Sequence, residues 1–210
     1  MLRFAAAPDH DVVSRLEPSA RRSVVCADVR SLGYTDTSLC ADAGFYCGEV
    51  GGGRPLTDVY ADGVRLQPAR WPDEGWLEIG TVVDGKNEKT FKAGLDLAPW
   101  VREPSLKVSG YFRQLWADFT CTPAKFDPEA GTVSLGRQEP RCHVVAGRPW
   151  YILDAAHALS RPGEWWLDRP RGKLYVWPVR GARRYAVSTF SGAFVELENV
   201  RHFAFAGLVF

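Results

Sequence analysis

The chain has 210 residues, of which 46% are hydrophobic and 12% aromatic, a composition that supports a buried core and excludes a disordered protein. Its 26 basic and 25 acidic residues give a formal net charge of +1, so we expect neither nucleic acid nor an anionic membrane as a partner. No stretch approaches the ~20 consecutive apolar residues that span a bilayer.

The first part of the chain, residues 1–23, is expected to be a helical or linking segment. Residues 9–22 begin with acidic side chains and carry the only helical signal near the N-terminus. The apolar patch before them contains Arg3 and is shorter than the ~7–15 residues of a signal-peptide core, so export is not visible in this sequence.

Residues 24–185 are expected to form one β-rich domain, a sandwich or barrel with short helices. Short apolar segments alternate there with turn residues, a pattern that disfavours βαβ units. The expected strands cover residues 23–29, 56–60, 64–67, 77–81, 107–112, 115–121 and 132–135. The Asp62-Gly63 step between two of them predicts a hairpin.

Three stretches interrupt these strands. Residues 33–55 and 82–104 are rich in turn-forming residues and are expected to be mainly loop, the first with room for one irregular strand. Residues 154–159 predict a short helix.

Residues 162–178 predict a second hairpin, in which both faces carry apolar side chains. Trp165 and Leu167 point to one side and Trp166 to the other, because side chains alternate along a strand. Such a hairpin needs cover on both faces, so Trp165, Trp166 and Trp177 are expected in the core.

The last segment, residues 186–210, groups its apolar residues in twos and threes between single bend residues, as in one coil of a parallel β-helix. Such a coil is stable only when neighbouring coils stack on it. Because the sequence stops within an apolar strand, we expect the chain to be a fragment of a longer protein.

Four segments, residues 25–33, 59–75, 163–178 and 200–210, together resemble one protein family in content and order. They are similar to the right-handed parallel β-helix carbohydrate-active proteins grouped as glycoside hydrolase family 141. The resemblance implies a β-rich insertion domain followed by the first coil of a parallel β-helix, in a secreted or periplasmic enzyme that degrades plant-type polysaccharide. It also implies that the catalytic acids lie on later coils, which this chain does not contain.

The resemblance therefore implies that this piece shapes the substrate cleft without catalytic residues of its own. It would meet poly- or oligosaccharide through its parent enzyme and pack on the rest of its own β-helix. Two alternatives remain open: a self-contained carbohydrate-binding or structural β-domain, and a fragment of a β-helix polysaccharide lyase.

Carbohydrate contact is expected at exposed tryptophans, since an indole face stacks on the apolar face of a pyranose. Trp71, Trp76 and Trp116 lie near turns or polar neighbours and are the candidates. For any single tryptophan, however, a place in the core is the more common outcome.

The acidic residues and histidines show no pattern in the sequence that is typical of a catalytic or metal site. Asp73 and Glu74 are adjacent and would point apart in an extended segment, and Asp118 is interpreted as a hydrogen-bonded structural carboxylate. The four histidines lack metal-site spacing, so we expect no metal and no cofactor.

The five cysteines form no Cys-x-x-Cys pair. Disulfides between Cys40 and Cys47 and between Cys121 and Cys142 would suit the spacing, but buried thiols, Cys26 included, are the favoured interpretation.

Overall fold

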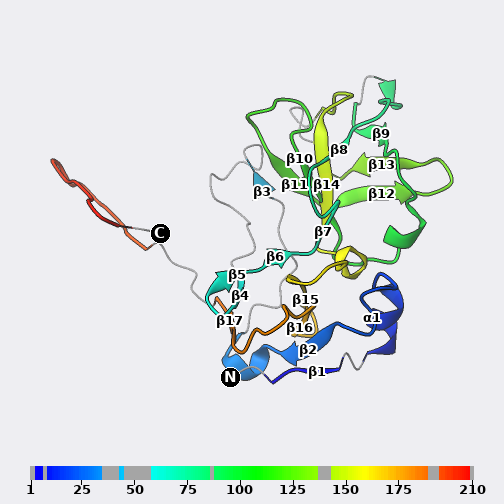
Figure 1. Cartoon of the computed structure of the whole chain (residues 1–210). Coiled ribbons are helices and arrows are strands. Elements are labelled where there is room, and N and C mark those ends of the chain that lie inside the picture. The colour runs from blue at the N-terminus through cyan, green and yellow to red at the C-terminus, as the bar shows by residue number, and fades with distance from the viewer. Residues whose placement is uncertain are drawn as a thin grey trace.

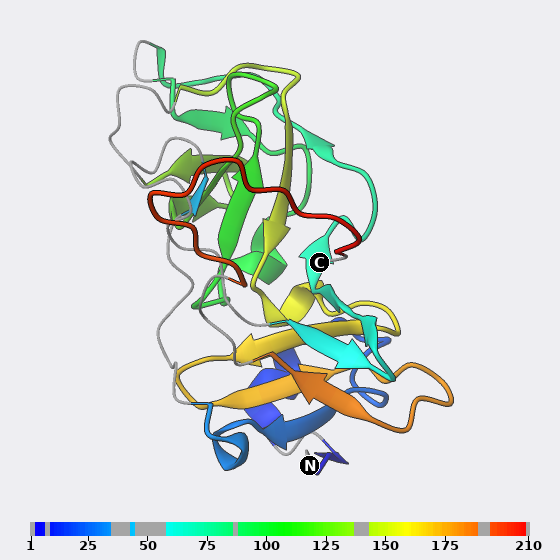
Figure 2. The ribbon, with the colours of Figure 1, turned by 90° about the vertical axis from the view of Figure 1, so that its left-hand side faces the viewer.

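The computed structural model describes residues 3–6, 9–34, 43–44, 58–85, 88–136, 143–188 and 194–208. Within these ranges the chain is mainly β, with short helices and no closed barrel, which confirms the predicted fold class of a β-rich domain. Figures 1 and 2 show sheets at both ends of the molecule, with the short helices beside them.

The first sheet has the strand order β1 (Ala5–Ala6), β2 (Val25–Asp28), β16 (Lys173–Val176), β15 (Glu164–Asp168) and β6 (Gln67–Pro68). Neighbouring strands are antiparallel except β6 and β15, which pair in parallel across a long sequence separation. In Figure 1 this sheet occupies the lower part of the molecule, beside α1 (His10–Arg15).

The second sheet has the order β3 (Ala43–Gly44), β11 (Phe119–Cys121), β10 (Lys107–Gly110), β14 (Pro149–Leu153) and β7 (Arg70–Trp71), with β8 (Leu77–Glu78) also paired to β14. A third sheet, β12 (Pro123–Asp127), β13 (Thr132–Leu135) and β9 (Thr90–Lys92), lies next to it in the upper part of Figure 1. The fourth sheet consists of β17 (Tyr185–Val187), β4 (Val59–Ala61) and β5 (Val64–Arg65).

The 3-10 helices are η1 (Arg30–Leu32), η4 (Ala98–Trp100) and η5 (Ala156–Ala158). The helix predicted at residues 154–159 is thus a single 3-10 turn, η5. The loop prediction for residues 82–104 missed β9 and η4, and the central strand β14 was not anticipated.

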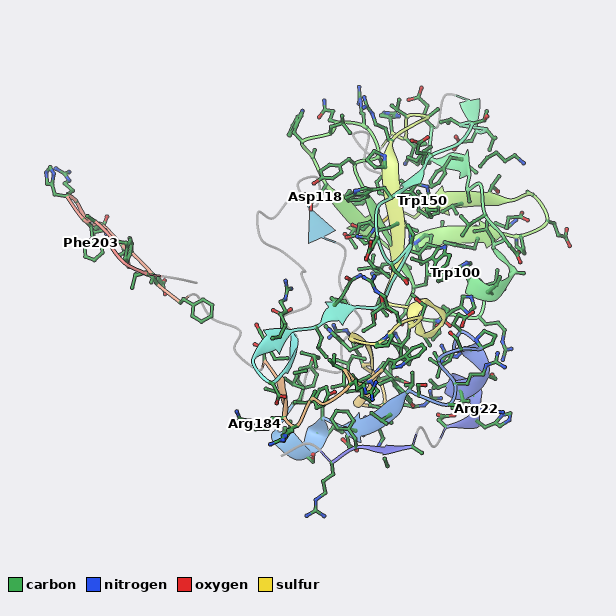
Figure 3. All side chains as sticks on the ribbon, in the orientation of Figure 1. Arg22, Trp100, Asp118, Trp150, Arg184 and Phe203 are labelled. Carbon is green, nitrogen blue, oxygen red and sulfur yellow. The ribbon has the colours of Figure 1, made fainter. Side chains whose placement is uncertain are left out.

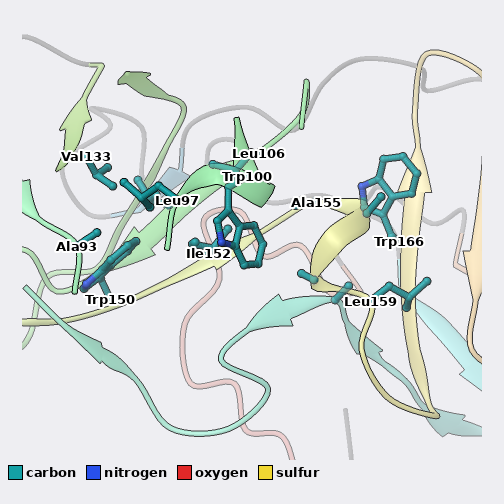
Figure 4. Close-up of a cluster of buried hydrophobic side chains, with 14 of the residues drawn as sticks. Ala93, Leu97, Trp100, Leu106, Val133, Trp150, Ile152, Ala155, Leu159 and Trp166 are labelled. Carbon is teal, nitrogen blue, oxygen red and sulfur yellow. The ribbon is translucent and has the colours of Figure 1, made fainter. Parts of the chain in front are cut away.

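The hairpin of β15 and β16 confirms the alternation expected from the sequence. Trp166 and Tyr175 belong to the larger hydrophobic cluster, whereas Trp165 and Leu167 belong to the smaller one on the opposite face. Trp177, half-buried, packs against the larger cluster. Figure 4 shows members of the larger cluster, with Trp166 and Trp150 among them.

The hairpin of β4 and β5 is also confirmed, with Asp62 at φ 48° and Gly63 at φ 85°. Two consecutive positive φ values are what a two-residue hairpin turn of type I′ requires, and they explain the Asp-Gly step. The Asp62 carboxylate accepts hydrogen bonds from the backbone of Arg183 and Arg184 and so holds the segment before β17.

Helix α1 begins after Asp9, whose side chain accepts a hydrogen bond from the backbone N–H of Asp11 and caps the helix. Val12, Leu16 and Ala20 are fully buried in the larger hydrophobic cluster. The N-terminal segment is therefore packed into the same core as the sheets.

Residues 194–208 contain no strand in this structure, and their large apolar side chains, Phe194, Val195, Leu197, Val200, Phe203, Phe205 and Leu208, are exposed. Figure 3 shows Phe203 well separated from the body of the molecule. The ring centroids of Phe203 and Phe205 lie 4.9 Å apart.

Cys26 and Cys121 are buried, and Cys26 is a free thiol, as the favoured interpretation expected. Burial raises the pKa of the Cys26 thiol. Cys40, Cys47 and Cys142, and with them the suggested disulfides, lie outside the described residues. Among the residues described, no helix has the length and apolar character needed to cross a bilayer.

Candidate functional site

An open cleft of about 460 Å³ lies where the turn after β7 meets η4, η5 and the segment after α1. These four segments are distant in sequence and are brought together by the packing of the larger hydrophobic cluster. The cleft is lined by Glu17, Ser19, Trp71, Asp73, Leu95, Asp96, Pro99, Trp100, His157 and Ser160. It therefore combines aromatic rings with several carboxylates.

The aromatic rings that line the cleft are those of Trp71, Trp100 and His157. Trp71 is 37% exposed, and its ring centroid lies 6.4 Å from that of the buried Trp100. His157 meets Trp100 edge to face at 4.8 Å, and its Nδ1 lies 3.1 Å from the backbone oxygen of Arg15. Trp100 and His157 are thus fixed by packing, while Trp71 offers an accessible ring.

Three carboxylates line the cleft, those of Glu17, Asp73 and Asp96, one from each of three segments. Asp96 accepts the backbone N–H of Ala98 at 2.9 Å, at the start of η4. Glu17 accepts hydrogen bonds from the hydroxyl and backbone N–H of Ser19, which lower the pKa of its carboxyl. These bonds hold the two carboxylates in place as acceptors.

Asp73 is held by residues next to β15. Its Oδ1 accepts the Ser160 hydroxyl at 2.7 Å, and its Oδ2 lies 4.0 Å from Arg161 Nε. Arg161 also reaches Glu74 at 2.7 Å and Glu164 at 3.3 Å. Asp73 and Glu74, expected to diverge, therefore contact one guanidinium, because residues 72–75 form bends instead of a strand.

Glu164 is fully buried behind this part of the cleft. Its Oε2 accepts the backbone N–H of Ser160 at 3.0 Å and that of Arg161 at 3.3 Å. Burial, followed by the nearby charge of Asp73, raises the pKa of Glu164 to about 7. Glu164 fixes the backbone of Ser160, the residue whose hydroxyl orients Asp73.

A buried ion pair supports η5. Arg15 Nη1 lies 2.7 Å from Glu103 Oε2, and both side chains are enclosed. The Glu103 carboxylate also accepts the backbone N–H groups of Ala156 and His157 at 2.9 and 3.1 Å. Burial raises the pKa of Glu103, against the opposing effect of Arg15. The pair ties α1 to the turn that presents His157 to the cleft.

The three tryptophans expected to contact carbohydrate lie in different surroundings. Trp71 lines the cleft. Trp76, 46% exposed, packs against Tyr111 and Tyr151 at 5.7 and 5.1 Å between ring centroids and is not among the cleft residues. Trp116, 63% exposed, also lies outside the cleft. The structure therefore gathers only Trp71 of the three into this site.

Asp118, interpreted as a structural carboxylate, is half-buried immediately before β11 and does not line the cleft. No group of three His, Cys, Asp or Glu residues in the described ranges is arranged to hold a metal ion.

Trp100, Glu17 and Asp96 were not anticipated as site residues, and His157 was expected to be structural or on the surface. Trp100 follows Pro99 in a stretch without regular alternation, which gave no reason to place it beside Trp71. The only signal was indirect: both tryptophans stand next to a proline, in segments that cannot continue as strands.

No family model and no curated protein matches this sequence. One solved structure, described as "Glycoside hydrolase", is similar in fold, with a TM-score of 0.54 and 17% sequence identity. The similarity covers 79% of this chain and 28% of that chain, so the present chain spans less than a third of the protein that it resembles.

Proposed function

We propose that this chain is a carbohydrate-binding, β-rich domain of a glycoside hydrolase, and that the cleft at Trp71 holds part of a glycan. The observation that carries the proposal is the cleft itself, which an accessible indole ring and ordered carboxylates line together. A pyranose presents an apolar face that stacks on indole and hydroxyl groups that donate to carboxylates. The cleft offers a partner for both: an indole ring for the apolar face and carboxylates for the hydroxyl groups.

The parent protein is proposed to be a β-helix enzyme of the glycoside hydrolase 141 type, acting on plant-type polysaccharide outside the cytoplasm. The fold similarity to part of a larger glycoside hydrolase supports an accessory position in such a protein. The exposed apolar side chains of residues 194–208 also support it, since one coil of a β-helix buries them only against its neighbours. In this arrangement the chain inserts into the β-helix and helps to shape its substrate cleft.

The test is a titration of the protein with neutral xylo-oligosaccharides, followed by isothermal calorimetry and tryptophan fluorescence. Trp71→Ala should abolish measurable binding, because it removes the accessible ring of the cleft. Trp116→Ala is the matched control, since it removes an exposed tryptophan outside the cleft and should leave the affinity unchanged. Equal loss in both variants, or no binding by the wild type at millimolar sugar, would contradict the proposal.

A further inference from the structure

The charges around the cleft are distributed unevenly. Three of its lining residues are carboxylates, Glu17, Asp73 and Asp96, and none of its described lining residues is lysine or arginine. Among the described lining residues His157 has the one basic side chain, and its Nδ1 faces a backbone oxygen. The surface that would meet a ligand is therefore predominantly negative.

The nearby arginines do not supply a positive site for a ligand anion. Arg161 faces three carboxylates, those of Asp73, Glu74 and Glu164. Arg15 is enclosed and paired with Glu103, as described above.

Arg21, close to Glu17, donates to the backbone oxygens of Leu16 and Ser14 at 3.1 and 3.2 Å. These three arginines are thus each engaged by other groups of the protein.

We infer that the cleft selects neutral glycans and rejects those that carry uronic acids. This inference rests on the proposed function and adds its ligand class. A uronate placed in the cleft meets a lining that carries three carboxylates and no lysine or arginine among its described residues, and its own hydration is lost without a compensating cation. A neutral sugar meets the same carboxylates as hydrogen-bond acceptors, so one set of residues both binds the ligand and excludes its acidic relatives.

A bound divalent cation is the usual way to join a carboxylate surface to an acidic glycan. The carboxylates of the cleft are not clustered for this purpose, because no three metal-binding side chains in the described ranges converge. Calcium should therefore not restore binding of a uronate.

The experiment compares two ligands that differ in a single group, by calorimetry with the intact chain. One is a xylo-oligosaccharide bearing glucuronic acid, and the other is the same oligosaccharide after reduction of its carboxyl to an alcohol. The reduced ligand should bind about tenfold or more tightly at low ionic strength, and added salt should narrow the difference. The measurements are made with chelator and repeated with calcium.

Asp96→Asn is the informative variant, because the amide oxygen can still accept the Ala98 N–H while one charge of the cleft is removed. This variant should reduce the preference for the reduced ligand over the acidic ligand several-fold. Glu129→Gln is the control, since that carboxylate is exposed in the turn between β12 and β13 and does not line the cleft, and it should leave the preference for the reduced ligand unchanged.

Equal or tighter binding of the acidic ligand, with or without calcium, would overturn the inference and leave the proposed function intact. An unchanged preference in Asp96→Asn would also overturn it. Failure of both ligands and of plain xylo-oligosaccharide to bind would instead overturn the proposed function itself.

Discussion

At the scale of single residues, the buried ion pair of Arg15 and Glu103 carries a clear energetic expectation. Glu103→Gln keeps the shape of the side chain but leaves the enclosed guanidinium with only the longer 3.5 Å pair to the exposed carboxylate of Asp11. Removing one partner of a buried pair costs about 3 kcal/mol in the free energy of unfolding, and urea denaturation would measure the loss.

The control for this change is Glu74→Gln, which breaks an ion pair of the same length, 2.7 Å, at a largely exposed carboxylate. Exposed pairs contribute about 1 kcal/mol or less, so this variant should unfold close to the wild type. Similar losses in both variants would show that the enclosure of Glu103 has no energetic effect.

Glu164 gives a pH-dependent expectation. Its pKa is raised from 4.5 to about 7, so the folded chain binds this proton more tightly than the unfolded chain. The stability that this contributes is fully present below pH 4.5 and is lost as the pH rises through about 7.

Glu164→Gln cannot titrate at this position and still accepts the same backbone N–H groups. Relative to the wild type, its free energy of unfolding should therefore increase between pH 4.5 and about 7, by up to ~1.4 kcal/mol per pH unit. Urea unfolding of both proteins across this range measures the difference. A difference that does not change with pH would contradict the expectation.

At the scale of secondary-structure elements, substitutions at two glycines distinguish the cost of a steric clash from the cost of an unfavourable backbone conformation. A Cβ on Gly110, in β10, would lie 2.5 Å from the Pro149 oxygen and 2.8 Å from Trp150 Cα, so β14 would have to move. A Cβ on Gly63 meets nothing within 4 Å, but the residue has φ +85°.

Gly63→Ala should therefore cost about 1 kcal/mol for its backbone conformation, and Gly110→Ala about 3 kcal/mol for the displaced strand. Thermal and urea unfolding of the two variants test which substitution lowers the free energy of unfolding more. A larger loss for Gly63→Ala would mean that the pairing of β10 and β14 adapts easily.

Elements with a strong local signal were predictable from the sequence. The Asp62-Gly63 turn is specified by the conformations that those residues adopt easily, and the hairpin of β15 and β16 by alternation over adjacent segments. Strand β14 shows the same alternation, with Trp150 and Ile152 fully buried, yet its partners come from β7, β8 and β10. Such distant pairings have no local signature, and neither does the cleft that they assemble.

The candidate site shows the same limit. Trp71 was predicted as a ligand contact because it lies near a turn and polar neighbours, and these features can be read from a single segment. Trp100 and Asp96 belong to the site only because η4 packs beside the turn after β7. This contact between η4 and the turn after β7 forms only in the folded chain, so no sequence motif could have predicted it.

At the scale of the whole molecule, the exposed apolar segment 194–208 predicts association. A chain that ends at Ser188 should keep the melting temperature of the full chain, since the large apolar side chains of residues 194–208 are exposed. It should also bind less of a hydrophobic dye and show less self-association by light scattering. A marked fall in melting temperature would show that this segment stabilises the body of the molecule.

The placement of β15 has a consequence for how the molecule loses its structure. Leu167 belongs to one hydrophobic cluster and its neighbour Trp166 to the other, so a single strand completes both. If either cluster melts, one face of this strand loses its buried contacts, and the other cluster then loses the side chains that the strand contributes to it. The two clusters should therefore unfold as one cooperative unit, and the cleft should disappear in the same transition.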